Sequence, residues 1–441
     1  MFPVVMKFGG AALADGPGVR RVVEIVRRYG GTRPIVVVSA HLGVTDLLDT
    51  VARSAAEGHL EGDRVRIRHR SLLRQLDLDP EMLDRWLVEL FGLLSAIQSR
   101  GRLQPGERDL VLSYGERMSA RVVAQALRAS GTPATPVDAW DLGLTTDSSH
   151  GEARPLPESQ TAIRAAIAEV PGVPVVTGFL AKDKHGNLTT MGRNGSDLTA
   201  ALVAEAVAAE DLQLWKAVGG MLTADPRIVA AARTIERLSY EEAAEYAFHG
   251  AEVLFAAALV PAQRAGLSVR ILDVHDPEAR GTLIASSSRE EGPVGIASRR
   301  AASRLHVEIG LGEARAPRIA EIGAVLARHR VEPVLVSGNS ERLSFAVPPS
   351  AGLEAAQEEL GRRATVEAGF AVAAVIGRAQ SPDGELARKS LEILLEERIE
   401  VVEVHLGARN ASQCFLVPVA DLERAVRALH EGMLQRHGAR V

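Results

Sequence analysis

The chain has 441 residues, more than one hydrophobic core usually serves, so we expect two or three domains. A composition with 46% hydrophobic and 24% charged residues is that of a globular protein. The net charge of -5 argues against a nucleic-acid partner, because phosphate backbones attract a basic face.

Cysteine content and hydropathy indicate the cellular compartment in which the protein is expected. The one cysteine, Cys414, excludes an internal disulfide and fits a reducing compartment, and we expect it to lie buried in a strand. No run of about 18 apolar residues occurs, so no membrane span is predicted. We therefore expect a cytoplasmic protein without a membrane partner.

The first predicted element is the strand Val4–Phe8, which runs directly into Gly9 and Gly10. Adjacent glycines let backbone N–H groups approach a polyphosphate, and Lys7 places a point charge where phosphoryl transfer builds negative charge. Lysine is rare in this chain, with five lysines among 51 basic residues. By itself this pattern is as consistent with a structural turn as with a phosphate loop.

Short apolar runs alternate with helical patterns up to about residue 285, which is typical of a parallel sheet covered by helices. Further strands are expected at 35–39, 175–179 and 268–273. Apolar residues at helical spacing across 46–130 predict a helical insertion. Residues 286–301 are small, polar and charged, and predict a linker.

Beyond this linker the chain repeats itself, with one copy in 302–365 and another in 366–441. Each copy predicts a β-α-β-β-α unit that a closing strand would complete, a ferredoxin-like plan. Two such modules can pack side by side, or across a dimer, and form a small-molecule site. The alternative is that they serve only dimerisation. The expected elements are 306–309, 316–329, 332–337, 342–347 and 352–362, then 372–376, 384–397, 400–406, 413–417 and 420–430.

Four more segments place polar side chains and glycines near expected strand ends, where α/β proteins bind ligands. They are SAHLGVTD at 39–46, SYGERMSA at 113–120, TMGRNGSD at 190–197 and TADPR at 223–227. The second segment predicts a glutamate at a helix start, and the third a helix N-terminus that favours an anion. Their candidate side chains are Ser39, Thr45, Glu116, Arg193, Ser196, Asp197 and Arg227.

Histidines contribute little to this prediction. We expect His41, within the first of the four segments, to be a solvent-exposed loop residue. No spacing of His, Cys and Asp indicates a bound transition metal, so no metal ligands are assigned.

Together, the opening KFGG and these four segments resemble the aspartate kinases of the amino-acid kinase superfamily. The resemblance covers essentially the whole length, and the paired ACT regulatory domains of that family match the repeats. It implies an α/β amino-acid kinase domain in 1–285, with a parallel-rich sheet covered by helices. Two ferredoxin-like ACT modules would follow in 302–365 and 366–441.

The resemblance also implies roles for single residues. Lys7 and Asp197 would be catalytic, and ATP would be bound by Lys7, Gly9, Gly10, Ser39, Lys216 and Arg227. The substrate would be bound by Thr45, Glu116, Arg193 and Ser196. The reaction would convert L-aspartate to 4-phospho-L-aspartate with ATP and Mg²⁺, the first step toward lysine, threonine and methionine. Feedback by lysine or threonine, and a homodimer formed through the ACT modules, are implied as well.

Several positions depart from the family pattern, and they cluster on the nucleotide side. Ala11 and Ala12 stand where Thr-Ser is usual, and Lys216-Ala217 stands where Thr-Asp is usual. Leu222 replaces a tyrosine, Glu252 a lysine and Asn194 a glycine. Phe255-Ala256-Ala257 replaces His-Pro-Arg. Lys216 is a candidate to compensate for the lysine lost at 252. Three hypotheses stay open: a working aspartate kinase with an altered nucleotide site, a weak or inactive homologue acting as an amino-acid sensor or regulatory subunit, and a kinase for another small acidic amino acid.

Overall fold

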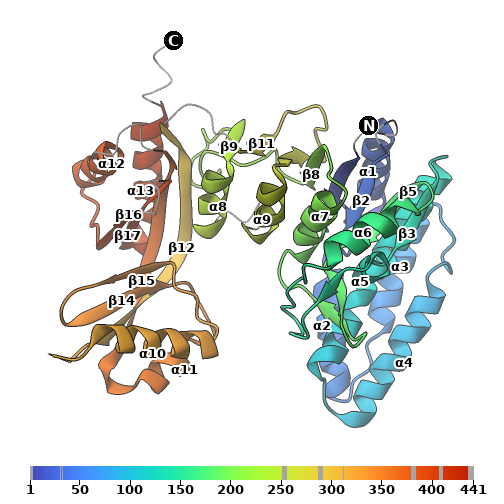
Figure 1. Cartoon of the computed structure of the whole chain (residues 1–441), viewed down its shortest axis with the longest axis horizontal. Coiled ribbons are helices and arrows are strands. Elements are labelled where there is room, and N and C mark those ends of the chain that lie inside the picture. Colours follow the sequence, from blue (N-terminus) through green and yellow to red (C-terminus); the bar gives the residue numbers. More distant parts are fainter. Residues whose placement is uncertain are drawn as a thin grey trace. The chain divides into compact units, whose positions relative to one another are not determined.

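The computed structural model describes residues 3–29, 31, 33–250, 256–286, 292–310, 312–378, 384–406 and 411–435. The chain forms two compact units, shown in sequence colours in Figure 1. The first contains Met1–Met221 and Phe255–Ser286, and the second contains Leu222–Leu254 and Ser287–Val441. This division differs from the predicted boundary, because residues 222–254 group with the C-terminal repeats. No helix in the described ranges is long and apolar enough to cross a membrane.

The first unit is built on a mainly parallel sheet with the strand order β3-β5-β2-β1-β8-β10-β11. Only the β10–β11 pair among these is antiparallel. The α/β class is therefore confirmed, and the four predicted strands are present with shifts of at most two residues. The strands are β1 (Val4–Phe8), β2 (Ile35–Val38), β3 (Ala134–Val137), β5 (Val173–Thr177), β8 (Asp211–Lys216), β10 (Ser268–Asp273) and β11 (Thr282–Ala285).

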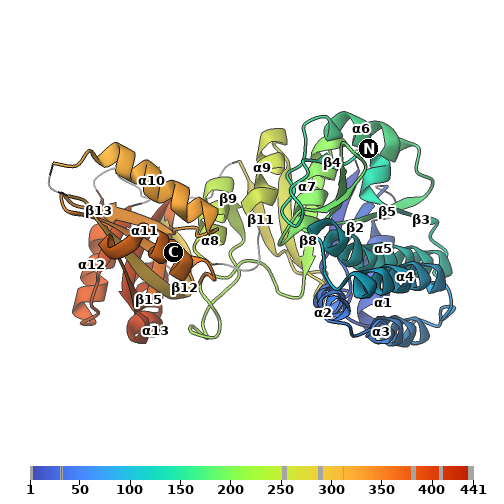
Figure 2. The same cartoon turned by 90° about the horizontal axis from the view of Figure 1, so that it is seen from below.

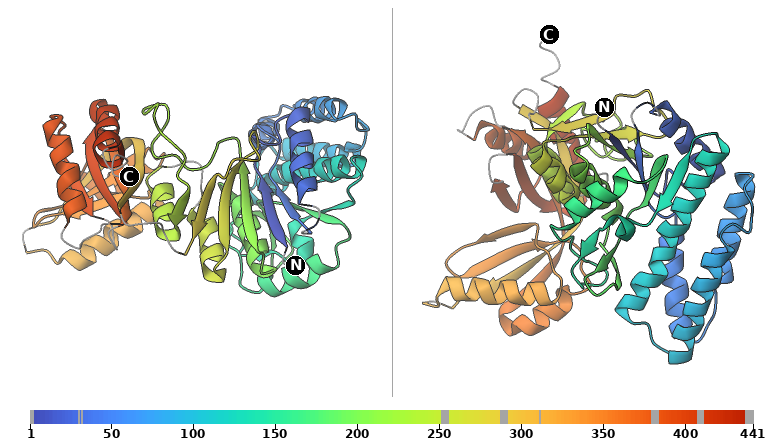
Figure 3. Two further views of the ribbon diagram at one scale, coloured as in Figure 1. Left: turned by 90° about the horizontal axis from the view of Figure 1, so that it is seen from above. Right: turned by 45° about the vertical axis from the view of Figure 1, so that its right-hand side comes forward.

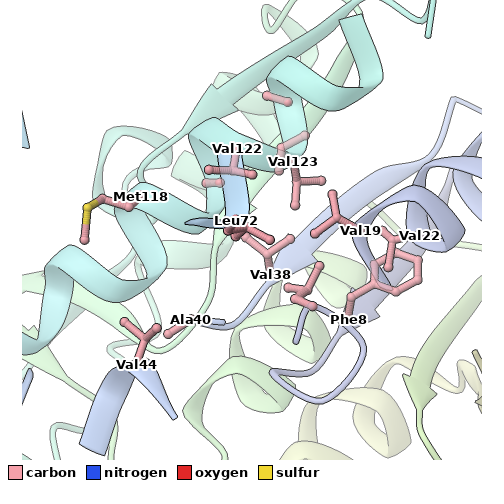
Figure 4. Packing of buried hydrophobic residues seen from close by; sticks show 14 of the residues in the cluster. Phe8, Val19, Val22, Val38, Ala40, Val44, Leu72, Met118, Val122 and Val123 are labelled. Atoms are coloured by element: carbon pink, nitrogen blue, oxygen red, sulfur yellow. The ribbon is translucent and has the colours of Figure 1, made fainter. Parts of the chain in front are cut away.

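Helices cover both faces of this sheet (Figures 1 and 2). Val4, Met6 and Phe8 pack into the main core with helices α1 (Gly16–Arg28) and α5 (Pro105–Ala129), as Figure 4 shows for Phe8. Side chains alternate along a strand, so Lys7 points to the opposite face. That face is covered by α7 (Gly195–Ala206), against which α6 (Ser159–Ala168) and α9 (Ala256–Ala265) pack.

The predicted helical insertion is confirmed and forms the group of long helices coloured blue to cyan in Figure 3. One detail was wrong: Glu116 lies in the middle of α5 and not at a helix start, because α5 begins at Pro105 with a capping box between Gln104 and Glu107. Gly115 serves close packing, since a Cβ there would lie 2.8 Å from the Ala40 Cβ. The other helices are α2 (Val44–Ala56), α3 (Asp63–Gln75) and α4 (Asp84–Arg100).

A small sheet of order β4-β6-β7 completes the first unit. Its third strand, β7 (Leu188–Thr190), leads into the loop before α7. The other two strands are β4 (Thr145–Thr146) and β6 (Leu180–Asp183).

In the second unit, the two repeats share one antiparallel sheet of order β13-β14-β12-β15-β17-β16. Each repeat has the predicted β-α-β-β-α sequence of elements. Helices α10 and α11 pack on the first repeat, whereas α13 packs on the second. The elements are β12 (Gly292–Glu308), α10 (Arg315–Arg328), β13 (Leu335–Gly338), β14 (Arg342–Val347), α11 (Leu353–Leu360), β15 (Ala364–Arg378), α12 (Glu385–Glu396), β16 (Glu403–Leu406), β17 (Ser412–Pro418) and α13 (Leu422–His430), preceded by β9 (Arg237–Ser239) and α8 (Tyr240–Phe248).

The two repeats exchange their closing strands. The second half of β12 pairs with β14 and with residues 364–367 of β15, whereas its first part, 292–299, pairs with residues 372–378. The start of β15 thus closes the first module, and the start of β12 closes the second. Residues 292–301 are therefore strand and not the irregular linker expected from their composition. Cys414 lies buried in β17, as predicted.

Candidate active site

Two lysines and one carboxylate form the centre of the candidate site. Lys7 on β1 lies opposite Leu214 on the neighbouring parallel strand β8, so Lys216, two residues further on, faces the same side of the sheet. Helix α7 covers that side and carries Asp197 in its first turn. The Nζ atoms of Lys7 and Lys216 lie 2.6 Å and 2.8 Å from the two oxygens of Asp197.

The charges in this cluster do not balance. Burial opposes ionisation of Asp197, but the ammonium groups of Lys7 and Lys216 outweigh it and lower the pKa of this carboxyl. Burial and the neighbouring Lys7 lower the pKa of Lys216, although Asp197 opposes this shift. Two ammonium groups around one carboxylate leave an excess positive charge in a largely buried place, which attracts an anion.

The loop after β1 lies directly beside this charge. Its backbone makes consecutive turns, in which Ala12 N–H donates to Gly9 O (3.0 Å) and Leu13 N–H donates to Gly10 O (3.1 Å). A Cβ on Gly9 would lie 3.4 Å from the Lys7 Nζ, and one on Gly10 would lie 3.0 Å from the Ala40 carbonyl oxygen. Glycine thus keeps the approach to the Lys7 ammonium open at position 9, and fits the close contact with the loop after β2 at position 10.

Glu116 is the buried acid of the site. Its Oε1 accepts a hydrogen bond from the Ala40 N–H (3.0 Å), while Oε2 is buried and has no hydrogen-bond partner among the described residues. Burial raises the pKa of Glu116 to about 7, against the opposing effects of the Ala40 N–H and Lys7. An unpartnered carboxylate oxygen near Lys7 suits a bound cation such as an ammonium group.

The remaining sequence-predicted residues of the first unit lie at strand and helix ends. Ser39 follows β2 and donates its N–H to the Phe8 carbonyl (3.1 Å), and Thr45 lies in the first turn of α2. Ser196 is buried against Gly178, where a Cβ would come within 2.5 Å of the Ser196 Cβ. Arg193 is exposed in the loop before α7.

Asn194 is a departure from the family pattern, and Arg227 is a predicted nucleotide-binding residue. Asn194, the N-cap of α7, has a φ of 59°, which asparagine tolerates better than most residues, so it can replace a glycine there. Arg227 belongs to the second unit, where its guanidinium pairs with Asp225 (2.9 Å). Glu252 and Phe255 lie outside the described residues.

The prediction for His41 was wrong, because this residue is buried. Its Nδ1 donates to the Leu13 carbonyl (2.8 Å), which ties the loop after β2 to the loop after β1, and its ring meets the edge of His69 with centroids 5.9 Å apart. Burial lowers the pKa of His41 to about 3 and that of His69 to about 4. The sequence did contain a signal for a buried partner of His41: on α3, His69 follows Val65 by four residues and so shares its buried face.

This histidine pair makes stability depend on pH. In the unfolded chain both imidazoles titrate near ~6.5. Below that pH the unfolded state therefore binds protons that the folded state does not bind, and the free energy of unfolding falls as pH falls. Replacing His41 with glutamine, which keeps a donor, should reduce the slope of unfolding free energy against pH by about 1.4 kcal/mol per pH unit between about pH 6.5 and 4. Urea unfolding measures this slope, with exposed His59→Gln as the control. Equal slopes for His41→Gln and wild type would contradict the assignment.

Comparison with known proteins identifies the family. The model of the amino acid kinase family matches residues 3–273. Lysine-sensitive aspartokinase 3 of Escherichia coli (strain K12) is 30% identical over 98% of this chain and 99% of its own length. The chain belongs to the aspartokinases, within the amino acid kinase family. Structures of E. coli aspartokinase III agree: the complex with aspartate and ADP has a TM-score of 0.83 at 30% identity, and the complex with lysine and aspartate 0.80 at 31%. They cover 97% and 98% of this chain, and 99% of each matched chain.

The positions at which this aspartokinase departs from the family pattern lie in different environments. Ala12 packs into the hydrophobic core, so the change there alters the core and not the open side of the loop. Ala11 and Ala217 are exposed. Leu222 belongs to the second unit, where it bridges to Thr234. Among these positions within the described ranges, it is Lys216 that contacts the Lys7–Asp197 pair.

Proposed function

We propose that the chain transfers the γ-phosphoryl group of ATP to the side-chain carboxylate of L-aspartate, giving 4-phospho-L-aspartate. The observation that carries this proposal is the pairing of Lys7 and Lys216 with the buried carboxylate of Asp197. An excess positive charge beside a glycine loop is what a transferring phosphoryl group requires. The relative crystallised with aspartate and ADP supports the choice of substrate and nucleotide.

At the phosphoryl end, Lys7 and Lys216 would neutralise charge that develops on the transferring group. The N–H groups of Gly9 and Gly10, and the hydroxyl of Ser39, would hold the phosphates. Asp197 would orient the two lysines and would not act as a base, because a carboxylate acceptor with a pKa near ~4 is already ionised at neutral pH. Catalysis would then rest on positioning and charge neutralisation.

Mg²⁺ would enter with the nucleotide. Both Asp197 oxygens are engaged by ammonium groups, and the described residues contain no group of three His, Cys, Asp or Glu side chains suited to an ion. The donors present therefore do not fit a protein-held Mg²⁺ site. Bound to the phosphates, the ion would offset part of their negative charge.

At the acceptor end, Glu116 would bind the ammonium of aspartate through its unpartnered Oε2. Exposed Arg193 would bind the α-carboxylate, since a guanidinium can hold a carboxylate through two hydrogen bonds. Thr45 and Ser196, in the first turns of α2 and α7, would add hydrogen bonds.

The second unit would provide regulation. We propose that the two ferredoxin-like modules bind a feedback amino acid, lysine or threonine, as the lysine complex of E. coli aspartokinase III suggests. We also propose a homodimer formed through these modules. The edge strands β13 and β16 expose Val336, Val404 and Leu406, and an exposed apolar edge is suited to pairing with another chain.

Acyl phosphate formation tests the function directly. Purified protein with MgATP and aspartate should yield aspartyl hydroxamate when hydroxylamine is present, and glutamate should yield much less. An equal yield of hydroxamate from glutamate or another small acidic amino acid would contradict the assignment of aspartate as the specific acceptor. No product with any acceptor, while aspartate still binds, would contradict the kinase and leave an amino-acid sensor.

A further inference from the structure

Asp109 is a buried acid outside the set of residues discussed so far. It lies on α5 with only 1% of its surface exposed. Its Oδ1 accepts from the Thr190 hydroxyl (2.7 Å). Its Oδ2 accepts from the backbone N–H groups of Thr190 (3.2 Å) and Gly151 (3.1 Å) and from the Nδ1 of His150 (2.9 Å). One carboxylate therefore joins three segments that are far apart in sequence.

The segments joined by Asp109 lead to the proposed acceptor site. Thr190 ends β7, and its carbonyl accepts from the Ala153 N–H (2.9 Å), so the 147–154 loop is bound to Thr190 as well as to Asp109. Gly192 follows in the left-handed region with a φ of 72°, and a Cβ there would lie 3.3 Å from the Gly151 carbonyl oxygen. Arg193 is the next residue, so Asp109 holds both the strand end that precedes its backbone and the loop that packs against Gly192.

The same helix carries the other half of the acceptor site. Glu116 follows Asp109 by seven residues, so the two side chains lie on one face of α5, about 10 Å apart along the helix axis. The helix is continuous across this interval, and Glu116 is anchored at its own end by the Ala40 N–H. The position of Asp109 therefore sets the spacing between Glu116 and the loop that carries Arg193.

We propose that Asp109 is a positioning residue that fixes the distance between the ammonium-binding and carboxylate-binding groups of the acceptor site. It does not touch the substrate. An α-amino acid presents its ammonium and carboxylate at a fixed separation, so the spacing selects this class of acceptor. The inference rests on the proposed function, because it takes Glu116 and Arg193 as the two acceptor-binding groups.

The test is the replacement of Asp109 by asparagine, which keeps the shape but turns an amide donor toward groups that are themselves donors. The KM for aspartate should rise about tenfold, while the KM for ATP changes less than twofold. Thr190→Val, which removes one hydroxyl donor at constant shape, should shift the aspartate KM in the same direction by a smaller factor. This second variant decides the question if Asp109→Asn does not fold.

Asp147→Asn is the matched control. Asp147 accepts from the N–H groups of Ser149 (3.1 Å) and Arg154 (3.0 Å), both within its own loop, and it does not reach α5. Asparagine keeps an oxygen that can accept both bonds, so the loop is retained and we expect this variant to keep both KM values. Equal changes in the two KM values for Asp109→Asn, or the same behaviour as Asp147→Asn, would overturn the proposal.

Calorimetric titration with aspartate separates this inference from the proposed function. Wild-type protein that binds aspartate without forming an acyl phosphate would contradict phosphotransfer. The ratio of aspartate Kd values for Asp109→Asn and wild type would still decide the role of Asp109, with about tenfold expected. Wild-type protein that binds no aspartate would overturn both.

Discussion

Replacing Lys7 with alanine should lower kcat for aspartyl phosphate formation about a thousandfold, at the upper end of what loss of one preorganised donor costs. The reason is the charge arrangement: Lys7 is 5% exposed, and its Nζ lies 2.6 Å from an oxygen of buried Asp197. Without it, one ammonium faces one carboxylate, and the excess positive charge that holds the phosphoryl group disappears. Turnover with saturating MgATP and aspartate measures the effect.

Lys216 gives the second part of this prediction. Lys216→Ala should lower kcat by a smaller factor, because Lys7 remains, and the double variant should lose less than the product of the two losses, since both lysines share Asp197. Lys184→Ala removes an exposed lysine whose partner is Glu158 (3.3 Å), and it should behave as wild type. Full activity of the Lys7→Ala variant would contradict a catalytic role for Lys7.

Apolar runs and the glycines that follow them made part of the fold around this site predictable. Buried apolar runs placed β1, β2 and β10 correctly, and the glycines after β1 indicated the open side of the loop. Distances between segments were not available from sequence: Asp197 is 190 positions from Lys7, and only the packing of α7 on β1 brings them together. Lys216 was predicted as a nucleotide-binding residue, but its pairing with Asp197 was not predicted; the alternation along β8 shows that this lysine faces the same side of the sheet as Lys7.

Errors arose where tertiary packing overrode a local signal. Gly115 suggested a helix end, but it lies within α5 because only a glycine fits against Ala40. His41 follows a strand and was expected in solvent, yet its ring fills space between two loops and bonds to Leu13. The start of β12 has a linker-like composition, and only its pairing with β15 makes it a strand. Such long-range pairing has no counterpart in local sequence pattern.

Glu116→Gln should produce two opposite effects, a loss of acceptor binding and a gain in stability. Losing a charged partner for the aspartate ammonium should raise the aspartate KM about ten- to a hundredfold, the range for a hydrogen bond to a charged group. Wild-type protein should show a related pH effect. As pH falls below about 7, Glu116 takes up a proton and can no longer bind an ammonium as a carboxylate, so the aspartate KM should rise.

The stability gain follows from the sign of the same pKa shift. Burial raises the Glu116 pKa from 4.5 to about 7, so the folded state holds a proton that the unfolded state has lost between these values. The folded state therefore loses stability as pH rises from 4.5 to 7, by about 3 kcal/mol in total. Glutamine does not ionise and keeps an oxygen for the Ala40 N–H. The variant should thus gain up to about 3 kcal/mol in urea unfolding at about pH 8 and nothing near pH 4.5.

Exposed Glu24→Gln on α1 should change neither the aspartate KM nor the unfolding free energy. A Glu116→Gln variant that loses both acceptor affinity and stability would indicate simple damage to the fold. A variant that gains stability but keeps its aspartate KM would show that the buried carboxylate serves something other than acceptor binding. The combination of weaker binding and greater stability is the signature of a group kept ionised for its ligand at the expense of the fold.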